Sequence, residues 1–103
     1  MCHMTADTLS ELHDMADRLQ MKRDWFQEPP KASHPHYDIP EARRAKAIAL
    51  GAIEVDDRTG LHFAARLGLE WAELQQDECR ILKYTRTVQR TDRYRQAFIG
   101  RIE

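Results

Sequence analysis

One short stretch, residues 34–44, gathers side chains that could bind a ligand or carry out acid–base chemistry. It contributes two imidazoles, a phenol, a carboxylate and two guanidinium groups, from His34, His36, Tyr37, Asp38, Arg43 and Arg44. Imidazoles titrate near neutral pH and bind metals, whereas guanidinium groups recognise phosphate and carboxylate groups. We therefore expect a pocket here, with His36 and Asp38 as the candidate catalytic residues and His36 as contact or general base.

The first chemistry that this stretch suggests is the binding, or hydrolysis, of a phosphate-containing ligand or nucleotide. Asp38 is predicted to be the N-cap of a helix, and the free N–H groups at the start of a helix attract anions. Arg44 would clamp the anion, and an aromatic ring such as that of Tyr37 would form a wall against a base. No glycine-rich phosphate loop is present, so the motif specifies no ligand. The candidate ligand-binding residues are His3, His13, Tyr37, Arg43, Arg44 and Trp25.

The second chemistry is that of a metal-dependent hydrolase or nuclease. His3, His13, His36 and Asp38 form a set of three imidazoles and one carboxylate, which zinc or manganese would accept. A bound metal would lower the pKa of a water molecule and so generate a nucleophile. The spacing of His34 and His36 is no recognised ligand motif, so this hypothesis depends on the four groups meeting in space.

The third possibility is a protein without enzymatic activity, such as a phage-type inhibitor or sequestering protein that acts through its helical half. Acidic residues occupy the first part of that half, residues 70–78, and basic residues occupy the second part, residues 80–95. This division suits antiparallel pairing of two copies, but it also suits a solvated face with local ion pairs. Whether the chain is an enzyme is therefore left open.

The elements that must position these groups begin with a strand at residues 1–4 and a helix at residues 9–20. Thr8 and Glu11 form a capping-box pattern at the start of this helix. A second helix is expected over residues 39–50, with Asp38 and Glu41 as its capping box and Gly51 after its end. A strand at residues 52–55 follows. If the two strands paired in parallel, His3 would approach the loop before Asp38.

The second half of the chain has a helical pattern from Thr59 to about Gln89, with a break suggested near Gly68. A short last helix, capped at residues 91–92, would carry Tyr94, Phe98 and Ile102. A small domain cannot easily bury both an α/β core and this amphipathic region, so Trp71 is expected to be exposed. A homodimer is the simplest way to cover it.

The length of 103 residues and a net charge of −1 indicate a single domain over residues 1–103. We expect a helix-dominated α/β or α+β fold, with a few-stranded core over residues 1–57 and a helical extension over residues 58–103. No apolar run is long enough for a transmembrane helix, and no signal peptide is recognised. The near-neutral charge argues against nucleic acid as a partner. Two distant cysteines fit a reducing cytoplasm.

Several motifs in order make the chain resemble domain-of-unknown-function family 4031, which occurs in bacteria and phages. The motifs are Cys2-His3-Met4-Thr5-Ala6-Asp7-Thr8, Glu11-Leu12-His13, Trp25-Phe26-Gln27, His36-Tyr37-Asp38, Arg44 and Gly51-Ala52. The resemblance covers about residues 2–56 and implies a shared pocket, but the family lends no settled activity. Its members usually begin with a further strand containing a Tyr-Val-Asp-like run, which this chain does not show.

Overall fold

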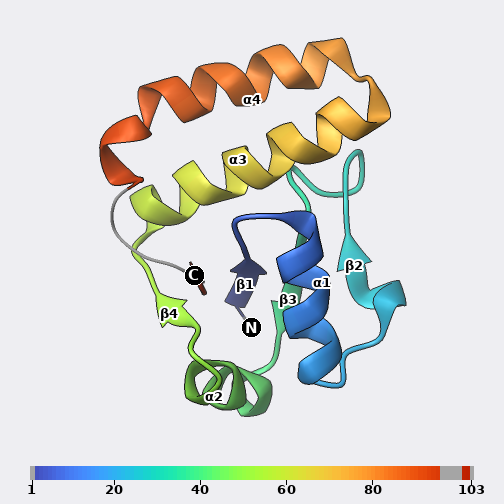
Figure 1. Ribbon diagram of the computed structural model, residues 1–103, viewed down its shortest axis with the longest axis vertical. Coiled ribbons are helices and arrows are strands. Elements are labelled where there is room, and N and C mark those ends of the chain that lie inside the picture. The colour runs from blue at the N-terminus through green and yellow to red at the C-terminus, as the bar shows by residue number, and fades with distance from the viewer. Residues whose placement is uncertain (1, 96–100, 103) are drawn as a thin grey trace.

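A mixed sheet and a long helical hairpin make up the computed structural model, which describes residues 2–95 and 101–102 (Figure 1). The elements in chain order are β1 (Cys2–Thr5), α1 (Leu9–Arg18), the 3-10 helix η1 (Arg23–Trp25), β2 (Phe26–Gln27), β3 (His36–Ile39), α2 (Glu41–Ala49), β4 (Ile53–Glu54), α3 (Asp57–Gln75), α4 (Glu78–Arg90), the 3-10 helix η2 (Asp92–Tyr94) and β5 (Arg101–Ile102). The sheet order is β2-β3-β1-β5-β4. The expected helix-dominated α/β fold is confirmed.

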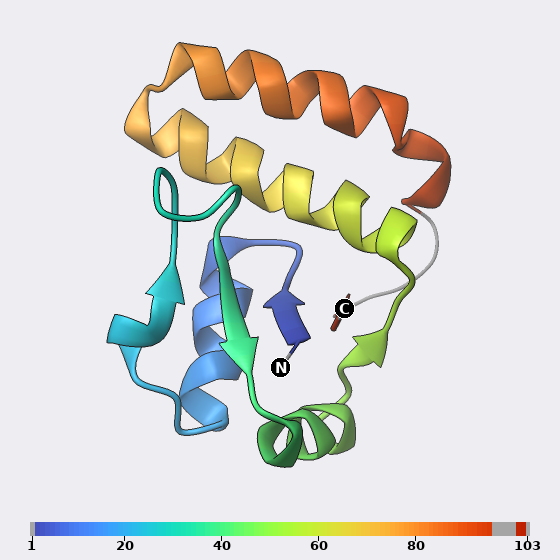
Figure 2. The ribbon, with the colours of Figure 1, turned by 180° about the vertical axis from the view of Figure 1, so that it is seen from behind.

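Helix α1 packs on one face of the sheet, and the opposite face is turned toward the viewer in Figure 2. Helices α3 and α4 form a hairpin across the end of the sheet where β1 leads into α1 (Figure 1). The core between α1 and the sheet contains fully buried side chains such as Met4, Leu12, Tyr37 and Ile39. None of the described helices has both the length and the apolarity that a membrane crossing requires.

Two local predictions are confirmed. The hydroxyl of Thr8 accepts a hydrogen bond from the backbone N–H of Glu11, at 3.1 Å, and caps α1. Gly51 follows α2 with a φ of 107°, which is costly for residues with a Cβ. Local sequence signals therefore located one start and one end of a helix correctly.

The prediction that Asp38 caps the second helix is wrong. Asp38 lies within β3, and α2 begins at Glu41 with Pro40 at the N-cap position. Strand β3 is antiparallel to β1, with Cys2 opposite Ile39 and His3 opposite Asp38. A strand pairing between segments far apart in sequence has thus displaced the local capping pattern.

The expected parallel pairing of the first and last predicted strands is also wrong. Strand β5 lies between β1 and β4; it runs antiparallel to β1 and parallel to β4. Strands β1 and β4 therefore run in opposite directions. Ile102, expected in a helix, belongs to β5, and Phe98 lies outside the described residues.

The helical half divides at Gln76 and Asp77, not near Gly68. Gln76 has a left-handed backbone with a φ of 56°, and the Asp77 carboxylate caps α4 by accepting from the backbone N–H of Arg80. Gly68 lies within α3 against the ring of Tyr84. Trp71 is buried, contrary to expectation, because it packs in the cluster between α3 and α4.

Candidate functional site

Strands β1 and β3 bring His3, His36 and Asp38 to one face of the sheet. His3 is opposite Asp38 in the antiparallel register. His36 and Asp38 are two residues apart on β3, so their side chains project from the same face. The Nε2 atoms of His3 and His36 each lie 3.3 Å from Asp38 Oδ1. The expected meeting of these three residues is confirmed, although Asp38 acts from a strand.

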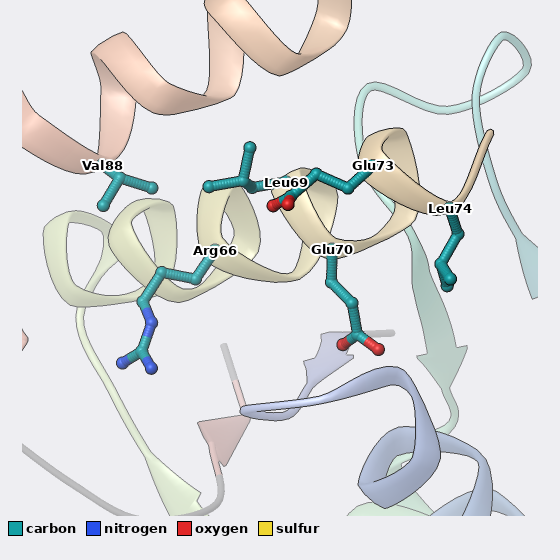
Figure 3. A pocket seen from close by; sticks show the side chains of 6 residues that line it. All are labelled: Arg66, Leu69, Glu70, Glu73, Leu74 and Val88. Carbon is teal, nitrogen blue, oxygen red and sulfur yellow. The ribbon is translucent and has the colours of Figure 1, made fainter. Parts of the chain in front are cut away.

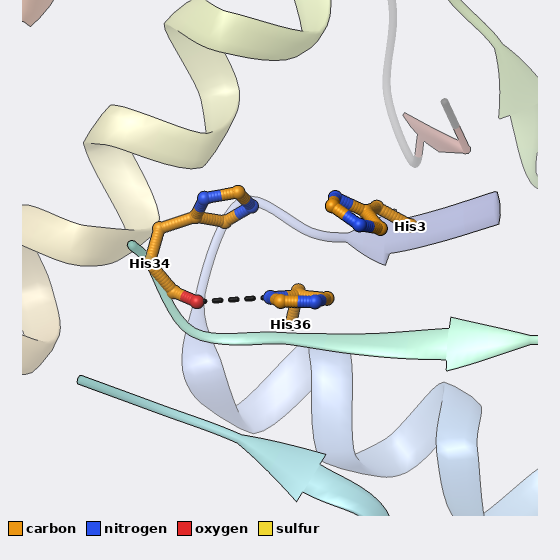
Figure 4. A group of neighbouring side chains, drawn as sticks. All are labelled: His3, His34 and His36. Atoms are coloured by element: carbon orange, nitrogen blue, oxygen red, sulfur yellow. Dashed lines mark hydrogen bonds between the residues drawn. The ribbon is translucent and has the colours of Figure 1, made fainter. Parts of the chain in front are cut away.

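His34 completes a group of three imidazoles, as Figure 4 shows. One ring nitrogen from each of His3, His34 and His36 can be chosen so that all three lie within 4.8 Å of one another. The ring centroid of His36 lies 4.2 Å from that of His3 and 4.8 Å from that of His34. His34 was not among the predicted site residues. Its signal was its place two residues before His36, although it lies in the bend before β3 and not in the strand.

The hydrogen bonds of His36 define how its ring is presented. His36 Nδ1 lies 2.9 Å from the carbonyl oxygen of His34 (Figure 4) and must donate its hydrogen there. In the neutral ring, Nε2 then carries a lone pair, which faces the carboxylate of Asp38. Such a juxtaposition is favourable only with a proton or a cation between the two atoms.

The ring of His34 has two features that a metal ligand requires: it is neutral, and one of its nitrogens has no hydrogen-bond partner among residues 2–95. Burial and the neighbouring imidazoles of His36 and His3 lower the pKa of His34 to about 4, so its ring is neutral at pH 7. Its buried Nε2 atom has no hydrogen-bond partner within residues 2–95. A buried polar atom without a partner is costly, and a metal ion would satisfy it.

Asp38 is held from a neighbouring strand. Its second oxygen, Oδ2, accepts a hydrogen bond of 2.6 Å from the side-chain amide of Gln27 on β2. The carboxylate is therefore oriented by Gln27 on one side and presented to His3 and His36 on the other. Outer contacts of this kind orient the ligands of metal sites.

His13 does not join this cluster, and its predicted place beside His3 and His36 is wrong. It projects from α1 toward the opposite face of the sheet, where Nδ1 lies 2.8 Å from the hydroxyl of Tyr37. Its ring also packs edge-to-face with the ring of Phe26, with centroids 4.6 Å apart. Burial lowers the pKa of His13 and raises the pKa of Tyr37. Tyr37 is fully buried and thus belongs to the core.

The two arginines have other partners. Arg44 forms an ion pair with Glu54 of β4. Arg43 donates from Nε to the carbonyl oxygen of Leu19, and its guanidinium carbon lies 5.3 Å from the ring centroid of Trp25. Because Asp38 lies in β3, it does not contribute to the helix start that was expected to bind an anion, whereas Arg43 lines a pocket beside it.

A pocket of about 430 Å³ adjoins the histidine cluster through Asp38. Its walls are formed by Asp24, Trp25, Gln27, Asp38, Pro40 and Arg43. This volume is within the range of small-ligand sites. Asp38 therefore belongs both to the imidazole cluster and to a space in which a small molecule would fit.

Helices α3 and α4 hold the segment that carries His34. The hydroxyl of Tyr84 donates to the carbonyl oxygen of Ser33 at 2.5 Å. The indole N–H of Trp71 donates to the Glu28 carboxylate at 2.8 Å. The helical hairpin thus supports the loop between β2 and β3, and with it one edge of the histidine cluster.

A second pocket, of about 460 Å³, lies along α3 and α4 (Figure 3). It is lined by Arg66, Leu69, Glu70, Glu73, Leu74 and Val88. The Glu70 carboxylate points toward the start of α1, where it accepts from the backbone N–H of Leu9 at 2.8 Å. Its lining contains no histidine or cysteine, so the histidine cluster remains the better candidate for chemistry.

Residues 1–67 match the model of a protein family described as "Protein of unknown function (DUF4031)". The chain belongs to this family. The matched residues include His3, His34, His36 and Asp38, and the match ends within α3. Neither curated proteins nor solved structures gave a match to the chain.

Proposed function

We propose that this protein binds a divalent transition metal through His3, His34 and His36, with Asp38 as a fourth ligand or as a partner of a metal-bound water. The observation that carries the proposal is the convergence of three ring nitrogens within 4.8 Å. Nitrogen ligands with one carboxylate suit zinc, and manganese is a second candidate.

The proposed activity is metal-dependent hydrolysis of a phosphate-containing ligand or nucleotide. Three protein ligands leave a coordination position for water, whose pKa the metal would lower. Asp38 would accept a proton or orient that water, since its Oδ1 atom already faces the ring nitrogens of His3 and His36. The pocket beside Asp38 would receive the substrate.

The charges around this pocket favour metal-dependent binding over direct binding of an anion. Its walls contain the carboxylates of Asp24 and Asp38 but only one guanidinium group, that of Arg43. Without a cation this balance repels phosphate. A dication at the histidine cluster would reverse it, so phosphate-containing ligands should bind only to the metal-loaded protein.

Metal content of protein purified without a histidine tag, followed by calorimetric titration with zinc and manganese, tests the proposal. His34→Gln should weaken metal binding at least about tenfold, since it removes one ligand. His13→Gln is the matched control, because His13 lies on the other face of the sheet. Wild-type protein that binds neither metal would refute the proposal, and so would equal effects of the two substitutions.

We also propose a cytoplasmic location, supported by two free cysteines, Cys2 and Cys79. The homodimer stays a prediction. Trp71, whose expected exposure was the reason for predicting a dimer, is buried. Leu74 on α3 and Leu82 on α4 are exposed apolar side chains that a partner could cover. Light scattering at working concentrations measures the association, and a monomer there contradicts the prediction.

A further inference from the structure

We propose that the pocket beside Asp38 takes the planar base of a nucleoside monophosphate, with Trp25 as the stacking residue and the phosphate directed to the metal. This inference rests on the proposed metal site and names the class of its ligand. It starts from the position of Asp38, which contacts His3 and His36 and also lines the pocket. A ligand in the pocket would therefore reach the proposed metal site through Asp38, because none of the three histidines lines the pocket.

Trp25 gives the pocket an aromatic wall. It directly precedes β2, and its side chain is 39% exposed, whereas the other tryptophan of the chain, Trp71, is buried. The guanidinium group of Arg43 lies over its ring. An exposed indole of this kind offers a stacking surface for a base, and stacking tolerates every base because each has a π-face.

The charged groups of the pocket favour the same orientation of the ligand, with its phosphate at the metal and its base at Trp25. The carboxylates of Asp24 and Asp38 repel an anion and outnumber the one guanidinium group of the pocket, that of Arg43, so the phosphate is disfavoured inside the pocket. Carboxylates do accept hydrogen bonds from sugar hydroxyls and from base amino groups. The anionic end is therefore directed to the metal side of Asp38, and the neutral, hydroxyl-rich and planar part to the side of Trp25.

The size of the pocket agrees with this class of ligand. A volume of about 430 Å³ lies in the lower part of the range for small-molecule sites. It suits a single nucleoside better than a folded polymer. We therefore expect monomeric nucleotides to bind, with a contribution from the base that does not depend on its identity.

Three probes separate the parts of the ligand: AMP, ribose 5-phosphate, which lacks the base, and adenosine, which lacks the phosphate. Each is titrated calorimetrically into the full chain loaded with one equivalent of zinc and into the metal-free chain. AMP should bind the loaded protein about tenfold more tightly than ribose 5-phosphate, since stacking supplies the difference. Adenosine should bind more weakly than AMP, and metal-free protein should not bind AMP.

Trp25→Ala provides the decisive variant, because Trp25 is exposed and its loss leaves the core intact. It should weaken AMP about tenfold and leave ribose 5-phosphate unchanged. Tryptophan emission should change on AMP binding in wild type, and this change should disappear in Trp25→Phe.

The outcomes separate the two proposals. Failure to bind zinc refutes the metal site and the inference that depends on it. Normal zinc binding with equal affinities for AMP and ribose 5-phosphate, or with equal effects of Trp25→Ala on both, refutes only the stacking role. Normal zinc binding with no binding of either probe refutes the nucleotide ligand and leaves the metal site standing.

Discussion

Replacing Gly68 with alanine should destabilise the protein, although alanine is the better helix former. An added Cβ at Gly68 would lie 2.6 Å from both Cε1 and Cζ of the Tyr84 ring and 2.9 Å from its Cδ1. Carbon atoms pack at about 3.5–4.0 Å. The ring of Tyr84, which is 4% exposed, would therefore have to move by about 1 Å, and α4 with it.

The expected change in unfolding free energy combines one stabilising contribution and two destabilising ones. Alanine in place of glycine stabilises a helix interior by about 1 kcal/mol. Overpacking of a buried contact costs about 1–3 kcal/mol, and loss of the hydrogen bond from Tyr84 to Ser33 costs about 1 kcal/mol more. The net loss of unfolding free energy is about 2 kcal/mol, which corresponds to a decrease in Tm of roughly 10 °C for a chain of this size.

Urea unfolding monitored by circular dichroism measures this change, with Tyr84→Ala as the matched background. Without the ring, the same substitution at Gly68 should stabilise the protein by up to about 1 kcal/mol, the helix-propensity term alone. An increase in stability for Gly68→Ala in the wild-type background would refute the described contact between α3 and α4.

Three further predictions concern the site and the core. Tyr84→Phe removes the hydroxyl that donates to Ser33; it should weaken zinc binding about tenfold in calorimetry, and unchanged affinity would contradict the supporting role of α4. Leu12→Ala, at a fully buried position, should lower the urea-derived unfolding free energy by about 2–5 kcal/mol, and a loss below about 1 kcal/mol would contradict its core position. The hydrogen bond from the backbone N–H of Thr59 holds the pKa of Asp56 in the folded protein below its ordinary value of 3.8. The ionised Asp56 carboxylate therefore stabilises the fold fully above pH 3.8, and this stabilisation is lost as the pH falls through the pKa of Asp56 in the folded protein. Asp56→Asn retains a cap and should reduce this acid-side loss in urea midpoints compared at roughly pH 3 and pH 6; an undiminished loss would assign it to other groups.

The parts of the fold that sequence predicted correctly depend on contacts between near neighbours. The Thr8 cap joins residues three apart, and Gly51 acts through its own backbone angle. The boundary between α3 and α4 also has a local signal, the Asp77 cap. It was missed because the left-handed residue before it is Gln76, where glycine is the usual choice.

Strand β3 could not be predicted in the same way, because its pairing with β1 joins Cys2 to Ile39 across the intervening chain. Asp38 and Glu41 have the spacing of a capping box, and no neighbouring residue argued against a helix start at Asp38. His34 was missed for a related reason: it lies in the bend before β3 and reaches the other imidazoles only through the fold. Three of the four convergent residues, His3, His36 and Asp38, were nevertheless predicted as neighbours.

The family match ends one residue before Gly68, whereas Trp71 and Tyr84, which hold the loop of His34, lie beyond it. The side chains of the proposed metal site and the hairpin that supports His34 thus belong to separate stretches of chain. If the proposed site binds a metal, substitutions in α3 and α4 would change its affinity without removing a ligand. Metal selectivity would then be adjustable from a distance, through the helical hairpin.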